Sequence, residues 1–214
     1  MPHPTTPTPT SPPTPAPAPA SPTTPATGRR GRKKARTRHA LADAALRLFL
    51  ERGYDQVSVK DVADAADVSV TTLFKHFPGK EALVFDREAE RGAELVAAVR
   101  DRAPGRTVLD ALHTHLRELL LAAHVSPGFR TFRELVDGTP ALSEYAHRMW
   151  MRHETALAAA LAEETGTTVD DVTVRALAHY VLAAPRPAGR GDDPGPAVDR
   201  IFALLKNGWD DIGA

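Results

Sequence analysis

The chain has 214 residues, no cysteine and equal numbers of acidic and basic side chains, which give a formal net charge of zero. The lack of cysteine excludes disulfides, thiolate metal sites and cysteine nucleophiles. No stretch approaches the roughly 18 to 20 apolar residues that a membrane-spanning helix requires, and we therefore expect a cytoplasmic protein without a membrane partner.

The first 27 residues differ in composition from the rest of the chain. They contain eleven prolines and eight threonines, but no Asp, Glu, Lys or Arg. Such a segment has too little apolar surface to build a core, which predicts a disordered, polyproline-like tail over residues 1–27. It also lacks the charged start and apolar stretch of a signal peptide. An inert extension and a ligand for a proline-binding module both stay open.

Seven positive side chains follow in the run GRRGRKKARTR, residues 28–38. We predict a basic arm over residues 28–36 that is flexible from Arg29 to Lys34, with Arg36 and Arg38 close to the start of the first helix. If the next module binds DNA, each cation that reaches a phosphate adds affinity by releasing counterions. The alternative is a solvated charge run.

The first helix is predicted by an apolar repeat at positions i, i+3, i+4, i+7 and i+8. The repeat consists of Leu41, Ala44, Ala45, Leu48 and Phe49, and it ends before Gly53. Glycine is a common terminator just beyond a helix. This helix is expected to cover the two shorter helical patterns that follow it.

Two short helical patterns with a tight turn between them occupy residues 58–83. Ser58 and Asp61 have the spacing of a capping box, and Ser69 is suited to cap the second helix. Asp67 lies in the turn and tolerates the left-handed backbone needed there. Helices joined this closely cross steeply, and the pattern predicts a helix-turn-helix.

The second of these helices separates apolar from polar positions. Its polar side chains are mostly short, which allows the helix to approach the edges of bases. The residues expected in the core are Val70, Leu73, Phe74 and Phe77.

The remaining sequence contains only helical patterns, interrupted by Pro and Gly. No segment alternates with period two, so no sheet is predicted. A connection rich in Pro, Gly and charge over residues 185–196 is longer than a tight helix hairpin requires. The helical patterns cover residues 80–102, 107–124, 128–137, 139–164, 168–184 and 196–209.

The neutral total conceals a separation of charge. Residues 29–80 contain twelve Lys or Arg against six Asp or Glu, whereas residues 81–214 contain fifteen against twenty-one. The basic part is the one with the helix-turn-helix, which favours a nucleic-acid partner for it.

The block from residue 37 to residue 83 resembles the DNA-binding domain of the TetR (tetracycline-repressor) family of bacterial regulators. The resemblance implies an all-α protein with a helix-turn-helix domain at residues 37–82 and a helical effector-binding and dimerisation domain at residues 83–214. It is carried by the Gly53-Tyr54 turn, the Val62-Ala63 pair, the stretch Leu73-Phe74-x-His76-Phe77, and Lys80-Glu81.

The resemblance also implies a function and a set of DNA contacts. The expected function is a homodimeric transcriptional regulator, usually a repressor, that binds a palindromic operator on double-stranded DNA and is released by a small-molecule effector. No cofactor and no enzymatic activity are expected. The helix from Ser69 would enter the major groove, with Thr71, Thr72 and Lys75 reading bases. Contacts to the DNA backbone would come from Ser58, Lys60, His76 and Lys80, with Arg36 and Arg38 added by the basic arm.

Two residues depart from the family pattern. Phe74 stands where family members commonly have Tyr, whose hydroxyl reaches a phosphate, and we expect Phe74 to serve mainly in the core. Asp67 replaces a glycine that is frequent in the turn. The second replacement is compatible with the fold because Asp tolerates the geometry.

In the family, the last two long helices form the dimer interface. Here they would be residues 168–184 and 196–209. The expected apolar seam consists of Leu177, Tyr180, Val181, Ile201, Phe202, Leu205 and Trp209.

Aromatic, Met and His residues gather in the central helices and are candidates for an effector pocket. The alternative for each is an ordinary place in the core. The histidines lack the i, i+4 spacing of a helical metal site, so no metal is expected. The pocket candidates are His113, Phe129, Phe132, Tyr145, Met149, Trp150 and His153.

Two other functions stay open at this point. One is a DNA-binding regulator without a small ligand, which would lack an apolar cavity in the central helices. The other is an all-helical enzyme with an active site among the C-terminal histidines. The second leaves the basic arm unexplained and has neither a nucleophile motif nor a glycine-rich phosphate loop.

Overall fold

The structure is a computed structural model that describes residues 28–126, 128–189, 191 and 193–208. Within these residues the regular structure is helical and no strand occurs, which confirms the predicted all-α class. The predicted tail and Trp209 lie outside the described residues. The helices are α1 (Arg29–Arg52), α2 (Val59–Ala65), α3 (Val70–His76), the 3-10 helix η1 (Glu81–Leu83), α4 (Glu88–Arg100), α5 (Val108–His124), α6 (Phe129–Gly138), α7 (Pro140–Thr165), α8 (Val172–Ala183), α9 (Pro185–Ala188) and α10 (Pro194–Asn207).

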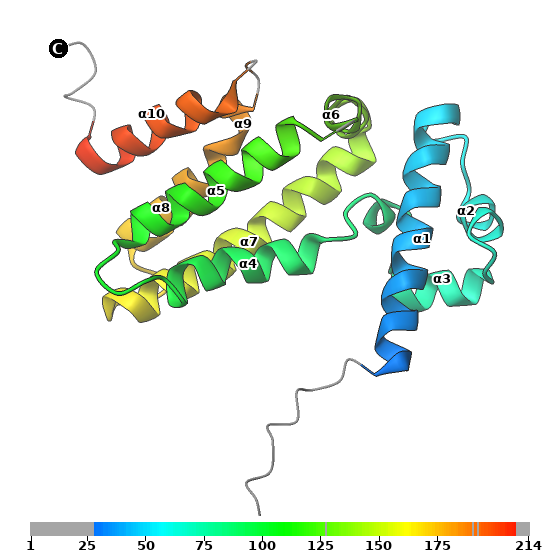
Figure 1. Ribbon diagram of the computed structural model, residues 1–214, viewed down its shortest axis with the longest axis horizontal. Helices are drawn as coiled ribbons and strands as arrows, with labels where there is room; N and C mark the ends of the chain where they lie inside the picture. Colours follow the sequence, from blue (N-terminus) through cyan, green and yellow to red (C-terminus); the bar gives the residue numbers. More distant parts are fainter. Residues whose placement is uncertain (1–27, 127, 190, 192, 209–214) are drawn as a thin grey trace, which may run out of the picture.

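The first three helices, at the right of Figure 1, supply most of the N-terminal core, which η1 and the start of α7 complete. Leu41, Phe49, Val62, Leu73 and Phe77 are almost completely buried in it. Burial of each such side chain is worth about 1.5–3 kcal/mol, so this small unit is held mainly by its apolar stripe. The predicted amphipathic pattern of α1 is therefore confirmed.

Local side-chain caps place α2 and α3. The Ser58 hydroxyl accepts a hydrogen bond from the Asp61 N–H, and the Asp61 carboxylate accepts one from the Ser58 N–H. Ser69 accepts a hydrogen bond from the N–H of Thr72. Between the helices, Asp67 has a φ of 52°, as predicted, and it is the one non-glycine residue with positive φ in the described part of the chain.

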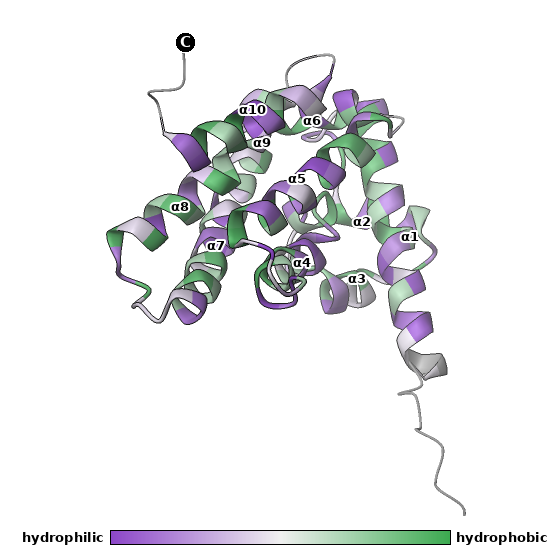
Figure 2. Ribbon diagram, turned by 60° about the vertical axis from the view of Figure 1, so that its left-hand side comes forward, coloured by the Kyte–Doolittle hydropathy of each residue, from purple (hydrophilic) through white to green (hydrophobic). Residues whose placement is uncertain are grey.

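The expectation of a flexible arm from Arg29 to Lys34 is wrong. These residues form the first turns of α1, which extend past α3 and away from the remaining helices in both views (Figures 1 and 2). Arg, Lys and Ala all have high helix propensity, and the helix of the apolar repeat continues backwards through them. The basic run is therefore an N-terminal extension of α1 rather than a flexible arm.

The single helix expected over residues 80–102 is also wrong, because the chain forms η1, then turns, and enters α4 at Glu88. Ala82, Leu83 and Val84 are buried in the N-terminal core. The Asp86 carbonyl accepts hydrogen bonds from the guanidinium of Arg38 at 2.7 and 3.2 Å. Packing and this long-range contact together interrupt the helix.

A second core joins α4, α5, α7, α8, α9 and α10. Helix α8 packs mainly against α7, and α10 packs mainly against α5. Between α5 and α10, the Asp199 carboxylate accepts hydrogen bonds from Arg117 at 3.0 Å and pairs with His113 at 2.7 Å. The His113 ring also stacks on Phe202, so α10 is held by both apolar and polar contacts.

The connection expected over residues 185–196 begins and ends in helix among the described residues. Its first residues form the short helix α9, in which Ala188 is buried. Helix α8 begins at Val172 rather than near residue 168, because the Asp171 side chain caps it. Helix α10 begins at Pro194, two residues before the expected start.

The two cores meet under α6 and the start of α7. Leu142 of α7 is fully buried in the N-terminal core. Phe85 stacks on Tyr145 with ring centres 5.3 Å apart and meets the edge of Phe132 at 6.2 Å. The segment that leads into α4 is therefore packed on both sides, and it connects the three N-terminal helices to the C-terminal bundle.

Candidate nucleic-acid interface and effector cavity

Helix α3 presents a continuous exposed surface. Thr71, Phe74 and Lys75 are exposed and Thr72 is half-buried, while Leu73 on the opposite side is fully buried. The Thr72 hydroxyl lies 2.9 Å from the Ser69 hydroxyl. Three of these side chains were predicted to read bases, and their placement fits a helix that enters a major groove.

Phe74 is placed differently from the expectation. Instead of packing in the core, its side chain is 51% exposed. Four-residue spacing puts it on the same face as Val70, which is itself only half-buried at the edge of the core. An apolar ring on the outer surface of α3 is thus available for contact with a partner.

The start of α2 lies at the side of this surface. Ser58 and Lys60 are both exposed. The Lys60 ammonium pairs with the Asp64 carboxylate at 2.6 Å, and this hydrogen bond raises the pKa of Lys60. An exposed pair of this kind contributes little stability, so Lys60 can exchange Asp64 for a phosphate.

Arg38 serves inside the protein rather than on the DNA-facing surface. It donates hydrogen bonds to the carbonyls of His76, at 2.6 Å, and of Asp86, and it lies over the ring of Phe77 at 4.2 Å. The guanidinium therefore joins α1 to the end of α3 and to the entry of α4. A contact from Arg38 to DNA would require these hydrogen bonds to open.

Lys80 is likewise held by the protein. Its ammonium donates to the Tyr54 carbonyl at 2.5 Å and lies 3.9 Å from the centre of the Tyr54 ring. Burial lowers the pKa of Lys80, whereas burial and the hydrogen bond to Glu81 raise that of Tyr54. A backbone contact from Lys80 to DNA would require this arrangement to open.

His76 ends α3 with its ring half-buried. Its Nδ1 atom is buried without a hydrogen-bond partner among the described residues. Burial lowers the pKa of His76, and the nearby charges of Lys34 and Arg38 lower it further. The proximity of Lys34 places the start of α1 beside the end of the recognition helix, with Lys33, Lys34 and Arg36 exposed.

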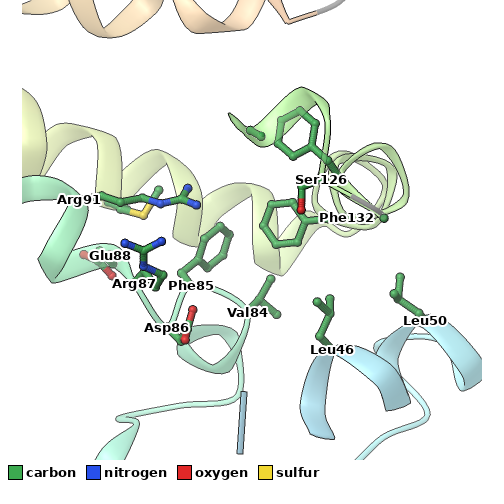
Figure 3. A pocket seen from close by; sticks show the side chains of 14 residues that line it. Leu46, Leu50, Val84, Phe85, Asp86, Arg87, Glu88, Arg91, Ser126 and Phe132 are labelled. Carbon is green, nitrogen blue, oxygen red and sulfur yellow. The ribbon is translucent and has the colours of Figure 1, made fainter. Parts of the chain in front are cut away.

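A cavity of about 370 Å³ lies where the two cores meet (Figure 3). Of the seven predicted pocket residues, Phe129, Phe132 and Met149 line it. Its other walls come from α1 and from the segment leading into α4, a combination that no sequence pattern indicated. The lining is Leu46, Leu50, Val84, Phe85, Asp86, Arg87, Glu88, Arg91, Ala123, Ser126, Gly128, Phe129, Phe132 and Met149.

The other four pocket candidates do not line this cavity. His113 faces α10, and Tyr145 stacks on Phe85 while donating to Glu88 at 3.0 Å. Trp150 packs against the C-terminal core. His153 lies 3.2 Å from the Glu88 carbonyl through Nε2, and it contributes to the contact between α4 and α7.

Two of the predicted dimer residues are unavailable at the surface. Val181 and Phe202 are fully buried in the C-terminal core of the single chain. Leu177, Ile201 and Leu205 are half-buried beside them. Tyr180 is 58% exposed.

Among the described residues, no cluster of His, Asp and Glu has the arrangement of a metal site. In the same part of the chain, none of the helices combines the length and the apolar character needed to cross a bilayer.

Comparison with known families gives two matches that together span most of the chain. Residues 41–86 match the model of bacterial regulatory proteins of the tetR family, and residues 108–210 match the MftR C-terminal domain. The transcriptional regulator TcmR of Streptomyces glaucescens is 32% identical over 154 residues, which cover 67% of each chain.

Two solved structures share the fold. The TetR-family repressor FadR of Thermus thermophilus, solved with lauroyl-CoA, is 27% identical, with a TM-score of 0.52 over 80% of this chain and 94% of its own. NalD of Pseudomonas aeruginosa, the secondary repressor of the MexAB-OprM efflux pump, is 20% identical, with a TM-score of 0.57 over 85% of this chain and all of its own. These similarities agree with the helix-turn-helix and the helical bundle described above.

Proposed function

This chain belongs to the TetR family of bacterial transcriptional regulators, and we propose that it is a cytoplasmic repressor that binds a palindromic operator as a homodimer. A small-molecule effector would release it by binding more tightly to a form with lower DNA affinity. The protein acts in this proposal by binding alone, without catalysis. TetR-family repressors solved with ligands, such as FadR with lauroyl-CoA, support the effector.

The observation that carries the proposal is the outer surface of α3. Its polar side chains stand on a helix whose opposite side is locked into the core by Leu73 and Phe77. A rigidly held helix with short outward side chains can enter the major groove without rearranging. Thr71 and Lys75 are proposed to contact base edges, and Ser58 and Lys60 to contact phosphates.

The partner subunit is proposed to dock on α8 and α10. The exposed Tyr180 and the half-buried Leu177, Ile201 and Leu205 form what we call the dimer seam. A two-fold dimer would place its two α3 helices about 34 Å apart, or slightly more, so that they meet successive turns of the major groove. This spacing requires an operator with two-fold symmetry.

The test is binding to the DNA beside the protein's own gene. The full chain is expected to shift one intergenic fragment at low salt and to protect a palindromic site in a footprint. Lys75→Ala should relax the base preference at one position of each half-site, because a good side-chain contact to a base is worth about 1–3 kcal/mol. Lys60→Gln should weaken binding to all sequences to a similar degree.

A matched control is Arg148→Gln, which removes an exposed charge on α7 that pairs with Glu144. It is expected to bind DNA as the unchanged protein does. If neighbouring intergenic DNA is not bound at low salt, or if Lys75→Ala leaves the base preference unaltered, α3 is not the reading helix of a local regulator.

A further inference from the structure

The cavity between the two cores has one charged end and one apolar end. Figure 3 shows Arg87 and Arg91 together at one side, and Leu46 and Leu50 of α1 at the other. The rings of Phe85 and Phe132 lie between them. A molecule that fills this space therefore meets the two arginines, with Asp86 and Glu88 beside them, at one end and mostly hydrocarbon along the rest of its length.

Three of the four charged side chains that line the cavity are already paired. Asp86 lies 3.3 Å from the His39 ring, and Glu88 accepts hydrogen bonds from Tyr145 and Arg152 at 3.0 Å each. Arg87 donates to Glu90 at 3.1 Å and lies 3.4 Å from Glu94. The hydrogen bonds of the two lining carboxylates are thus made with partners other than Arg91, while the charges of Asp86 and Glu94 act on Arg91 from nearby.

Arg91 has no hydrogen bond or ion pair from its side chain to any residue that the structure describes. Its side chain still reaches solvent, yet burial of the guanidinium among its neighbours lowers its pKa, and the adjacent Arg87 lowers it further. An arginine nevertheless stays charged at neutral pH. The cavity lining therefore includes an exposed cation with five N–H donors and no hydrogen-bond acceptor among the described residues.

We infer that this junction cavity binds a small apolar carboxylate, with Arg91 holding the carboxylate and Phe85, Phe132 and Leu46 enclosing the hydrocarbon. The inference adds a ligand class to the proposed function and rests on that function for its regulatory role. A guanidinium matches a carboxylate in shape and makes two parallel hydrogen bonds to it. The volume of about 370 Å³ falls within the 300–1,000 Å³ or so typical of small-molecule sites.

The same geometry disfavours other ligands. An amine would be brought beside two arginines, and like charges at close range repel. The carboxylates of Asp86 and Glu88 at the same end are already engaged by partners within the protein. A neutral alcohol would fill the apolar part but leave the Arg91 donors without a charged acceptor. The preference for an acid over its neutral and cationic counterparts is therefore the measurable signature of the site.

The cavity walls explain how such a ligand would reach the DNA-binding unit. Leu46 and Leu50 belong to α1, which packs directly on α2. Phe132 belongs to α6 and packs against the N-terminal core. An occupant that changes the spacing of α1 and α6 would therefore act on the reading helices without an intermediate element.

The experiment is calorimetric titration of the full chain, without DNA, with decanoate, 1-decanol and decylamine, each below its micelle concentration. These three share one hydrocarbon body and differ in the head group. Decanoate is expected to bind about tenfold or more tightly than 1-decanol, as for a hydrogen bond to a charged group, and decylamine the weakest. 2-Naphthoate serves as a second acid with an aromatic hydrocarbon part. Binding of either acid more tightly than 1-decanol supports the inference, and the acid that binds more tightly shows whether the cavity prefers a flexible or an aromatic hydrocarbon.

Variants test which end of the cavity binds the carboxylate and which end binds the hydrocarbon. Arg91→Gln should lower decanoate affinity about tenfold or more, to the level of 1-decanol, and leave 1-decanol binding unchanged. Arg91→Lys should retain part of the preference. Leu50→Gln, at a side chain that is already 42% exposed, should weaken decanoate and 1-decanol alike. Arg100→Gln, an exposed arginine on the same helix that pairs with Glu163, should bind all probes as the unchanged protein does.

The inference is overturned if neither acid binds, if decanoate and 1-decanol bind equally, or if Arg91→Gln retains full affinity for decanoate. A separate gel shift with and without saturating decanoate tests the regulatory role. If the protein binds no DNA with or without decanoate, the proposed function is contradicted. The calorimetry is independent of DNA and still tests the ligand class, so failure of the function and failure of the ligand class can be told apart.

Discussion

Phe74 shows how a single residue can change the character of a DNA-facing surface. In the resembled family a tyrosine is common here, and in this chain the ring is exposed on α3 without a hydroxyl. An aromatic ring on this surface offers apolar contact, for example with the methyl group of thymine. The polar contact to a phosphate that a tyrosine would make is absent.

Replacing Phe74 by Tyr should tighten operator binding about tenfold, because a hydrogen bond to a charged phosphate is worth roughly 1.5 kcal/mol or more. Phe74→Ala should weaken binding by removing the apolar contact. Both can be measured by fluorescence anisotropy on one labelled operator. Equal affinity of the Phe and Tyr proteins would mean that no phosphate lies within reach of this position.

His153 makes the stability depend on pH. Burial lowers its pKa from the ordinary 6.5, an effect that its hydrogen bond to the Glu88 carbonyl only partly offsets. The unfolded chain therefore takes up a proton more readily than the folded one, and stability that is complete above pH 6.5 falls as the pH drops through the unfolded value toward the folded value.

Denaturant unfolding at pH 7.5 and 5.5 checks this prediction. His153→Gln should show a smaller loss of stability between the two pH values than the unchanged protein. It should not abolish the loss, since burial also lowers the pKa of His76. His124→Gln, an exposed histidine at the end of α5, is the control and should lose stability in parallel with the unchanged protein.

At the scale of elements, the extended start of α1 gives the basic run a defined shape. The helix places Lys34 near His76 at the end of α3 and fixes Lys33 and Arg36 on the same extension, where a flexible arm would sample many positions. Less conformational entropy is then lost when these side chains meet the DNA backbone. The salt dependence of binding should report how many of them touch a phosphate.

The triple variant Lys33→Gln, Lys34→Gln, Arg36→Gln should bind operator more weakly at low salt. The slope of log K against log salt concentration should become shallower by roughly 0.9 for each phosphate that these substitutions leave without its cation. Anisotropy titrations between roughly 50 and 300 mM KCl measure this slope. An unchanged slope would mean that the extension points away from the DNA.

Elements set by nearby residues were predictable from the sequence, whereas those set by distant contacts were not. The caps of α2 and α3 and the left-handed Asp67 depend on residues within one turn, and their pattern is visible in the chain. The break before α4 depends on Arg38, which lies far away in sequence and captures the Asp86 carbonyl. Local periodicity contains no trace of that contact.

The candidate sites follow the same division. Periodicity identified which positions of α8 and α10 are apolar. It does not distinguish the apolar residues that face the core of the same chain from those that could face a partner subunit. Val181 and Phe202 are buried in the core of the chain itself. The cavity was only partly foreseen, because its walls combine α1, the entry to α4, and α6. The role proposed for Arg91 could not be predicted either, because it depends on the pairing of Asp86, Arg87 and Glu88 with other residues in the folded chain.

At the scale of the whole molecule, the charge separation along the sequence becomes a separation in space. Residues 29–80, which have the basic excess, form the helix-turn-helix unit at the right of Figure 1, and the sequence that follows has the acidic excess. Such an arrangement orients the molecule as it approaches DNA and speeds correct encounters. It also leaves the proposed dimer seam on the part that DNA does not attract.

Tyr180→Glu should destabilise the dimer, since it places a charge in the centre of a seam that must lose water on association. Sedimentation velocity should show a shift from dimer toward monomer, and operator affinity should fall with it because a monomer contacts one half-site. His147→Glu adds the same charge at an exposed position of α7 outside the seam. A dimer that is equally stable in both variants would place the interface elsewhere.

The contact of Arg38 with two carbonyls has a consequence for recombining this protein with its relatives. The Asp86 carbonyl is tied through Arg38 to the end of α3, while Asp86 also lines the cavity. Asp86, a residue of the proposed effector cavity, thus lies at the end of residues 41–86, which match the DNA-binding domain of the family. A chimera that joins this DNA-binding domain to the C-terminal domain of a relative would keep the native position of α3 only if the junction lies after Asp86, so that the contacts of Arg38 with both carbonyls are retained.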